Sequence, residues 1–388
     1  MSGLAGVPSS SADQRERLAR VALGRLGEPG DPRITRQLQQ LGAVRLYRQL
    51  CENDPRLDLA ADTAARRDGL DPGAELERAA RHGIRFVVPG DQEWPHGLAD
   101  LDHVQDLHRR GGAPLGLWVR GPLRLDEACR RSVAVVGSRS ATTYGASLAG
   151  QIAADLVGEG VTVVSGAAYG IDQAAHRGAL SGRGPTVAVL ACGADRVYPA
   201  AHRELLDYIA DTGLVVSEAP PGSAPTKLRF LSRNRLIAAM TVGTVVVEAA
   251  VRSGALNTAS WAGLLNRAVM GVPGPVTSAP SQGVHELIRS GAATLVTRGA
   301  DVLELVSPIG SHSLSLLRGP ERPADRLPEI DRQVLDSVPV VSAAPTASVA
   351  RTAGLAEPTV RAALARLRSA GFVEKGRAGW RLCAAASE

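Results

Sequence analysis

Long apolar runs, aromatic residues, lysines and clustered cysteines are all scarce in this 388-residue chain. Because no run of about 18 or more apolar residues occurs, we expect no membrane-spanning helix, and the first twenty residues lack the basic-then-apolar order of a signal peptide. The cysteines are far apart in sequence, which fits neither a disulfide framework nor a zinc site; they are Cys51, Cys129, Cys192 and Cys383. These absences predict a cytoplasmic protein with reduced thiols and no bound metal.

The shortage of aromatic side chains, at 3% against 44% hydrophobic residues, means that the core must be built from alanine, valine and leucine. Lys227 and Lys375 are the only lysines, so arginine carries nearly all the positive charge. A net charge of +5 and a pI near 9.3 permit a nucleic-acid partner without requiring one.

Three enzyme signatures are also missing. The loop "VVGSRSATTYG" follows an expected strand and opens a helix, but it is not G-x-G-x-x-G, and the next strand ends in Ser165-Gly166 rather than in an acidic residue. Neither lysine stands in a P-loop, and no G-x-S-x-G elbow occurs. We therefore expect no nucleotide cofactor.

The order of elements along the chain predicts three domains. Residues 1–12 are expected to be disordered, residues 13–82 to form a small helical domain, and residues 84–308 to form an α/β domain. Residues 309–328 have the composition of a linker. Residues 329–388 read as helix, helix, a turn at Gly354, helix and a strand–turn–strand, which is a winged helix-turn-helix pattern.

Within residues 84–308, short apolar runs alternate with helix-length segments. This alternation predicts a parallel sheet with helices on both faces, and binding loops at the carboxyl ends of the strands. The expected strands are "IRFVV", "LGLWVRG", "SVAVVG", "VTVVSG", "TVAVLA", "GLVVSE", "GTVVVEA" and "AVMGVPG".

The segment "RFLSRNR" places three arginines around Phe230. We expect Arg233 and Arg235 in the first turn of a helix, where cations are unfavourable unless an anion lies beside them. Loops that could hold a phosphate follow three of the strands, and Phe230 offers a stacking face for a base. The loops contain Ser138 and Arg139, Ser165 and Gly166, and Ser253, Gly254 and Ala255.

Two acidic groups and a histidine have the residue types of catalytic groups. Asp172 and His176 are one helical turn apart in "SGAAYGIDQAAHRGAL", and no nucleophile stands beside them in sequence. Glu248 ends the strand "TVVVEA" and could accept hydrogen bonds from the "SGALNTA" loop. We interpret all three as structural rather than catalytic.

The motifs between about Ile84 and Val296 resemble the DNA-processing protein A family, also called DprA or Smf. The resemblance rests on an ordered series: "VAVVGSR", "VVSGAAYGIDQAAHRGAL", "TVAVLACGADRVYP", "LVVSEAPPG", "FLSRNRLIAAM", "VVVEAAVRSGALNTASWA", "VPGPV" and "SQGVHELIRSGA". It implies an extended Rossmann-like fold that binds no dinucleotide, flanked by a helical domain of the SAM or helix-hairpin-helix kind and by a winged helix.

The resemblance also implies function. Family membership implies single-stranded DNA binding in a basic pocket, pairing into a homodimer, and loading of a RecA-type recombinase onto the strand, without catalysis or cofactor. The positions that match the DNA pocket are Arg139, Ser165, Gly166, Lys227, Phe230, Arg233, Asn234 and Arg235. The phosphate-loop argument adds Ser138 to the expected single-stranded DNA site. Leu287 and Ile288 match the segment used in pairing.

The chain departs from the family pattern at three positions. Leu231 replaces a proline, which we expect to loosen the loop of Phe230. Asn257 replaces a large apolar residue, and His285 stands where asparagine is common. Two other functions remain open. A nucleotide phosphoribohydrolase would need "PGGxGT" where this chain has "MTVGTVVVEAA", and a winged-helix transcription regulator would bind duplex DNA.

Overall fold

The computed structural model describes residues 11–57, 59–308, 310–312 and 322–383, and it divides the chain into two compact units, 1–314 and 315–388. Of the segment 1–12 that was expected to be disordered, residues 1–10 lie outside the described residues, whereas Ser11 already begins a helix. Half of the expected linker 309–328, namely residues 309 and 313–321, also lies outside them. Within the latter, Pro323–Arg326 forms a short 3-10 helix, η5. Among the described helices, none is both long and apolar enough to cross a membrane.

The first unit is built on a nine-stranded sheet with the order β1-β2-β6-β5-β4-β3-β7-β8-β9. Strands β3 to β9 run parallel, whereas β1 and β2 add an antiparallel edge. All eight predicted strands form, and β9 was not predicted. The bounds are β1 Ile84–Val87, β2 Leu117–Arg120, β3 Ser132–Val136, β4 Thr162–Ser165, β5 Thr186–Leu190, β6 Leu214–Ser217, β7 Gly243–Val246, β8 Ala268–Gly271 and β9 Thr294–Leu295.

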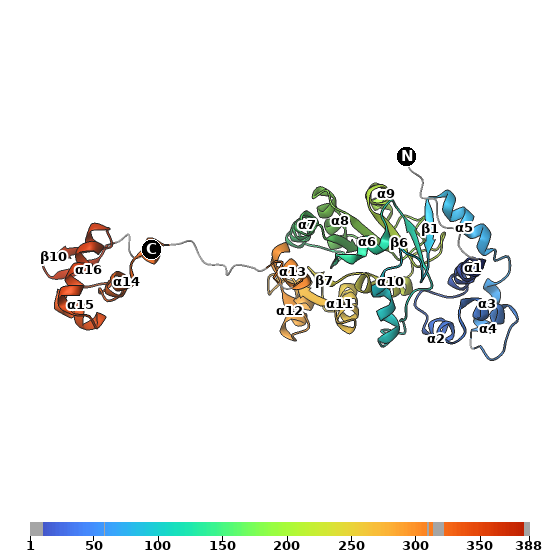
Figure 1. Cartoon of the computed structure of the whole chain (residues 1–388), viewed down its shortest axis with the longest axis horizontal. Coiled ribbons are helices and arrows are strands. Elements are labelled where there is room, and N and C mark those ends of the chain that lie inside the picture. Colours follow the sequence, from blue (N-terminus) through green and yellow to red (C-terminus); the bar gives the residue numbers. More distant parts are fainter. Residues whose placement is uncertain (1–10, 58, 309, 313–321, 384–388) are drawn as a thin grey trace. The chain divides into compact units, whose positions relative to one another are not determined.

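Helices cover both faces of this sheet, as predicted (Figure 1). On one face, valines of β3, β4 and β7 pack against α7, α8 and α13; on the other, alternate residues of the same strands pack against α10, α11 and α12. Strands buried on both faces explain the continuous valine runs. The helices are α6 Leu125–Arg130, α7 Thr143–Gly158, α8 Ile171–Ser181, α9 Arg203–Thr212, α10 Lys227–Ala239, α11 Gly254–Leu264, α12 Gln282–Arg289 and α13 Gly299–Val306, with 3-10 helices η2 His96–His103, η3 Ala200–His202 and η4 Ala279–Ser281.

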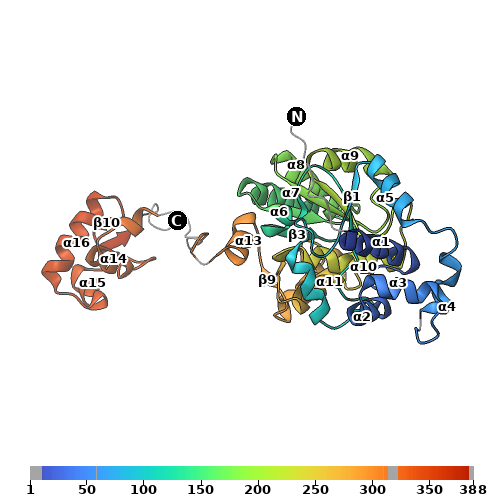
Figure 2. The same cartoon turned by 45° about the vertical axis from the view of Figure 1, so that its right-hand side comes forward.

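The N-terminal helices pack against the antiparallel edge of the sheet (Figure 2). Val21 of the first helix and Ala79 of the last share one core with Phe86 and Trp118 of β1 and β2. The predicted helical domain therefore belongs to the same compact unit as the sheet. Its elements are α1 Ser11–Leu26, α2 Pro32–Leu41, α3 Ala43–Cys51, α4 Ala60–Thr63, η1 Ala64–Arg66 and α5 Pro72–Arg81.

The order of the strands creates a switch point between β3 and β7. From β3 the chain proceeds outward through β4, β5 and β6, and it then returns to β7 and proceeds the other way through β8 and β9. Loops at the carboxyl ends of β3 and β7 must therefore separate, and ligands of open α/β sheets bind in the crevice between such loops.

The described part of the second unit contains three α-helices, the 3-10 helix η5 and a two-stranded antiparallel hairpin, and its core includes the buried residues Val360, Leu364 and Trp380. Gly354 adopts a left-handed conformation with φ 65° and ends the second of these helices, where the sequence predicted a turn. The elements are α14 Glu329–Asp336, α15 Thr346–Ala353, α16 Glu357–Ser369, β10 Val373–Gly376 and β11 Gly379–Leu382.

Candidate nucleic-acid interface

An open pocket of about 690 Å³ occupies the switch point of the sheet. The loop after β3 supplies Ser138 and Arg139 to the lining of this pocket. The loop after β7 and the first turn of α11 supply Arg252 to Ala255, and one side of α10 completes the lining. The structure thus brings together residues that are far apart in sequence. Of the predicted site residues, the pocket is lined by Ser138, Arg139, Lys227, Phe230, Arg233 and Asn234.

The ionisable side chains that line this pocket are mostly cationic. Arg139, Lys227 and Arg252 are exposed, Arg233 is buried at 7% exposure, and Asp172 is the one acid among the described residues that line the pocket. The N-terminus of α11, capped by Ser253, also faces the pocket and adds partial positive charge. The pocket therefore has the electrostatic character of an anion-binding site. Sequence reasoning missed Arg252, although it lies in the quoted segment "VVVEAAVRSGALNTASWA".

Arg233 reaches under the pocket rather than out of it. Its Nη1 donates to the carbonyl of Val189 at 2.8 Å, and its Nε has no hydrogen-bond partner among the described residues. A Cβ at Gly166 would overlap the guanidinium, so any larger residue there would displace Arg233 from this position. Burial lowers the pKa of Arg233, and the nearby carboxylate of Asp172 opposes that effect. Burial likewise raises the pKa of Asp172, which Arg233 opposes.

Phe230 is half-buried at the mouth of the pocket, with charged and aromatic neighbours. The Arg139 guanidinium carbon lies 4.6 Å from the centre of its ring, and that of Arg233 lies 5.9 Å away. The ring of Tyr198 is 5.7 Å from it, centre to centre. Tyr198 and Tyr169 are 42% and 48% exposed, and with Phe230 and Arg139 they line a small adjoining recess.

Sequence reasoning missed both tyrosines. A signal was present, because the chain has only five tyrosines, and Tyr169 and Tyr198 lie in the loops after β4 and β5, inside the quoted motifs "VVSGAAYGIDQAAHRGAL" and "TVAVLACGADRVYP". An exposed cluster of aromatic rings among cations is the combination with which proteins stack unpaired bases and neutralise their phosphates.

Arg235 is a correction to the predicted site. Helix α10 begins at Lys227, capped by the Thr226 side chain, so Arg233 and Arg235 lie in its second and third turns and not in the first. Arg235 is 0% exposed, and its guanidinium forms a two-point pair with the Glu218 carboxylate at 2.7 Å. Its Nε donates to the carbonyl of Gly112 at 3.0 Å. The anion that Arg235 requires is therefore Glu218.

Two other predicted residues hold neighbouring elements of the site together through hydrogen bonds. The Ser165 hydroxyl is fully buried and donates to the carbonyl of Val135 at 2.7 Å. Asn234 donates to the carbonyl of Gly254 and to Asn257 Oδ1, both at 3.2 Å. Asn257, which departs from the family pattern, thus joins α11 to α10.

Glu248 occupies the place where a dinucleotide-binding protein holds phosphate. It is 2% exposed, and its carboxylate accepts from the amide of Thr142 at 2.9 Å and from its hydroxyl at 2.6 Å, at the N-terminus of α7. The prediction that Glu248 accepts hydrogen bonds from the "SGALNTA" loop was therefore wrong. Because a carboxylate of the protein itself already neutralises this helix end, α7 is not the phosphate cradle that its preceding loop suggested.

His176 of helix α8 is a core residue. It is 0% exposed, and its Nδ1 lies 2.7 Å from the hydroxyl of Thr186. Burial lowers the pKa of His176 to about 3. The structural interpretation of this residue agrees with these contacts.

The low pKa of His176 predicts a loss of stability in acid. Above the unfolded pKa of about 6.5 this histidine is neutral in both states and costs the fold nothing by titration; as the pH falls from 6.5 toward 3, the unfolded chain binds a proton that the folded chain does not, and stability is lost. We expect the free energy of unfolding to fall with a slope of up to about 1.4 kcal/mol per pH unit from this group. Urea unfolding at pH 7, 6 and 5 measures it; His176→Asn should reduce the slope, whereas His82→Asn, at an exposed histidine, should not. Equal slopes in all three proteins would contradict the assignment.

The fold and this pocket define a class: a doubly wound α/β protein with a cationic, aromatic-rimmed pocket at the switch point of its sheet. Residues 85–307 match the family model of DNA recombination-mediator protein A. The chain belongs to that family, as the sequence motifs indicated.

Individual relatives extend the match beyond the sheet. The chain is 47% identical over 331 residues to a putative DNA processing protein DprA of Mycobacterium tuberculosis, covering 84% of each protein. It is 35% identical over 308 residues to protein Smf of Escherichia coli, covering 77% of this chain and 76% of that protein. The X-ray structure of DprA from Streptococcus pneumoniae has a TM-score of 0.61 and 31% identity, covering 76% of this chain and 98% of that one.

Proposed function

We propose that this protein binds single-stranded DNA in the pocket at the β3–β7 switch point and presents the strand to a RecA-type recombinase. The observation that carries the proposal is the Phe230 ring, held at the mouth of the pocket between Arg139 and Tyr198. A base can stack on such a ring only when it is unpaired, and the surrounding cations match the phosphates on either side of it.

We further propose that the protein acts by binding and not by catalysis. Supporting this, the residues with catalytic side-chain types are already engaged in structural contacts: Glu248 with Thr142, and His176 with Thr186. Asp172 is 6% exposed and accepts from the amide of Ala168 at 3.3 Å.

Assembly and the C-terminal unit complete the proposal. We place the protein in the cytoplasm as a homodimer that pairs near α12, with the C-terminal unit acting as a winged helix. Leu287 and Ile288 of α12 are both partly buried against their own core, and each leaves part of its side chain accessible. Leu295 on the adjoining edge strand is 50% exposed and adds apolar surface there.

Binding to labelled oligonucleotides tests the proposal. We expect the full chain to bind a mixed-sequence single strand more tightly than the matching duplex, and with little sequence preference, because the pocket offers a ring face and cations. Fluorescence anisotropy at two salt concentrations measures both affinities. Equal or tighter duplex binding would instead favour a duplex-binding regulator, and release of a free base from a nucleotide would favour a phosphoribohydrolase.

A further inference from the structure

The loop between α1 and α2 forms hydrogen bonds with helix α10 on the side of the helix opposite the pocket. We define this loop, Gly27–Asp31, as the α10 clamp. The Glu28 carboxylate accepts from Arg229 Nε at 2.9 Å and from Nη2 at 3.1 Å. The Pro29 carbonyl accepts from the Ser232 hydroxyl at 2.7 Å. These contacts join residues about 200 positions apart in sequence.

The clamp is itself anchored to the sheet through Arg235. Gly30 has φ +66°, and a Cβ built on it would lie 3.2 Å from the Arg235 guanidinium carbon. The Gly30 carbonyl accepts from the amide of Gly111 at 3.1 Å, and the next residue, Gly112, accepts from Arg235. Glu218, at the end of β6, completes this support by binding Arg235.

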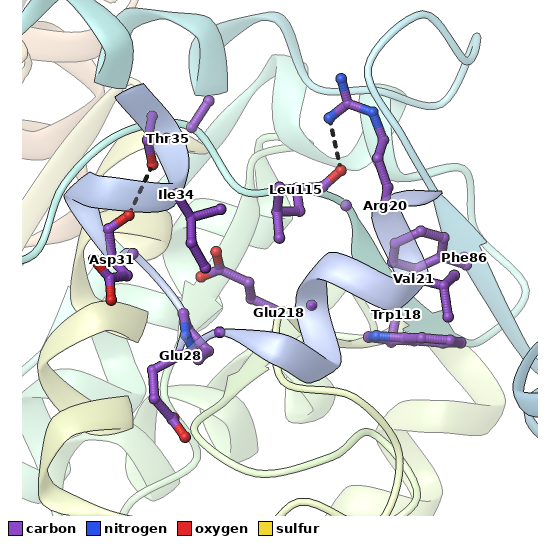
Figure 3. Close-up of a pocket in the computed structure, with 16 residues that line it drawn as sticks. Arg20, Val21, Glu28, Asp31, Ile34, Thr35, Phe86, Leu115, Trp118 and Glu218 are labelled. Carbon is purple, nitrogen blue, oxygen red and sulfur yellow. Dashed lines mark hydrogen bonds between the residues drawn. The ribbon is translucent and has the colours of Figure 1, made fainter. Parts of the chain in front are cut away.

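Figure 3 shows the clamp and Glu218 around a small cavity. Its volume is about 20 Å³, enough for about one water molecule. Phe86 and Trp118 of the antiparallel edge, and Val21 and Ile34 of α1 and α2, line other sides of it. This place is therefore a packed joint between the N-terminal helices and the sheet, and not a ligand site.

Helix α10 divides its side chains between these two neighbours. Arg229, Ser232 and Arg235 recur every three residues and contact the clamp and its support. Lys227, Phe230, Leu231 and Asn234 follow the other helical stripe and line the pocket. A shift or rotation of α10 at the clamp must therefore move the residues that face the pocket.

We propose that the α10 clamp sets the position of Lys227 and Phe230, so that single-strand affinity depends on N-terminal residues that do not line the pocket. This inference rests on the proposed function. Glu28 and Ser232 are positioning residues. Because Glu28 is negatively charged, its charge and its positioning role predict opposite effects of removing it on single-strand affinity. By charge alone, removing Glu28 should tighten binding to a polyanion, whereas loosening α10 should weaken it.

The test compares Glu28→Ala with a matched variant, Glu52→Ala, which removes an exposed carboxylate at the end of α3. We expect Glu28→Ala to weaken single-strand binding by about three- to tenfold, the size of a disrupted half-buried ion pair. The slope of log affinity against log salt should change by much less than the roughly 0.7 expected when Lys227 is removed, because the Lys227 ammonium is shifted and not lost. Glu52→Ala should bind as tightly as wild type or slightly more tightly. Ser232→Ala, an uncharged change, should also weaken binding.

Hydrogen exchange of the full chain separates the clamp from the proposed function. In Glu28→Ala and Ser232→Ala, the amides of residues 227–232 should exchange faster than in wild type, with or without DNA. Absence of single-strand binding by wild type would defeat the proposed function, while the exchange result would still decide whether the clamp holds α10. Unchanged exchange together with wild-type or tighter binding in both variants would overturn the clamp.

Discussion

Glu218→Ala is expected to lower the free energy of unfolding by about 3–5 kcal/mol. The variant leaves Arg235 fully buried with its charge uncompensated, since the Glu218 carboxylate is the charged partner of that guanidinium and accepts from it through both oxygens at 2.7 Å. Urea unfolding of the full chain, followed by tryptophan fluorescence, measures the change. The fall in the free energy of unfolding measures how much this ion pair stabilises the packing of the N-terminal helices on the sheet.

A matched control is the exposed pair formed by Arg289 and Glu286 at 2.7 Å, whose side chains are 77% and 58% exposed. Glu286→Ala should change stability by less than about 1 kcal/mol, because solvent screens the pair. Replacing both buried partners, as Glu218→Leu with Arg235→Met, should be less costly than Glu218→Ala alone, because no unpaired charge remains. If Glu218→Ala and Glu286→Ala were equally mild, the buried pair would not have the role assigned to it.

Phe230→Ala is expected to weaken single-strand binding by about ten- to a hundredfold, since stacking contributes about 1–3 kcal/mol per base. The salt dependence of binding should hardly change, because a ring releases few counterions. Lys227→Ala should behave differently: it should reduce the slope of log affinity against log salt by about 0.7. Anisotropy titrations over a range of salt concentrations distinguish the two effects.

Two further variants serve as controls for this comparison. Phe230→Trp should keep much of the affinity, because a ring face remains beside Arg139. Tyr208→Ala removes a ring that is 55% exposed and does not line the pocket, so it should bind normally. Because Phe230 is half-buried, thermal unfolding must accompany the titrations. A stable Phe230→Ala protein with wild-type affinity would show that the pocket works by charge and backbone alone.

The sheet could be predicted from sequence because its strands carry their own signal. Runs such as "SVAVVG" and "TVAVLA" are buried on both faces, so their composition alone separates them from the amphipathic helices around them. β9 carries no such signal: it has two residues, both exposed. The loops of the pocket could also be placed, because parallel strands bring their carboxyl ends to one edge.

The roles of individual arginines could not be predicted in the same way. Arg233 and Arg235 stand two residues apart on one helix, yet one lies beneath the pocket and the other faces Glu218 on a different element. Sequence spacing shows that their side chains point in different directions, but not which neighbour each one meets. The start of α10 was misplaced because Thr226, which caps it, was overlooked as an N-cap residue.

The scarcity of lysine gives amine chemistry unusual selectivity in this protein. Apart from the chain terminus, an acylating reagent can reach only two side-chain amines, and they lie in different compact units. Lys227 is exposed in the pocket, whereas the Lys375 ammonium lies 5.4 Å from the centre of the Trp380 ring. Acylation at position 227 therefore reports on occupancy of the pocket, and the same reaction at position 375 provides an internal reference on the other unit.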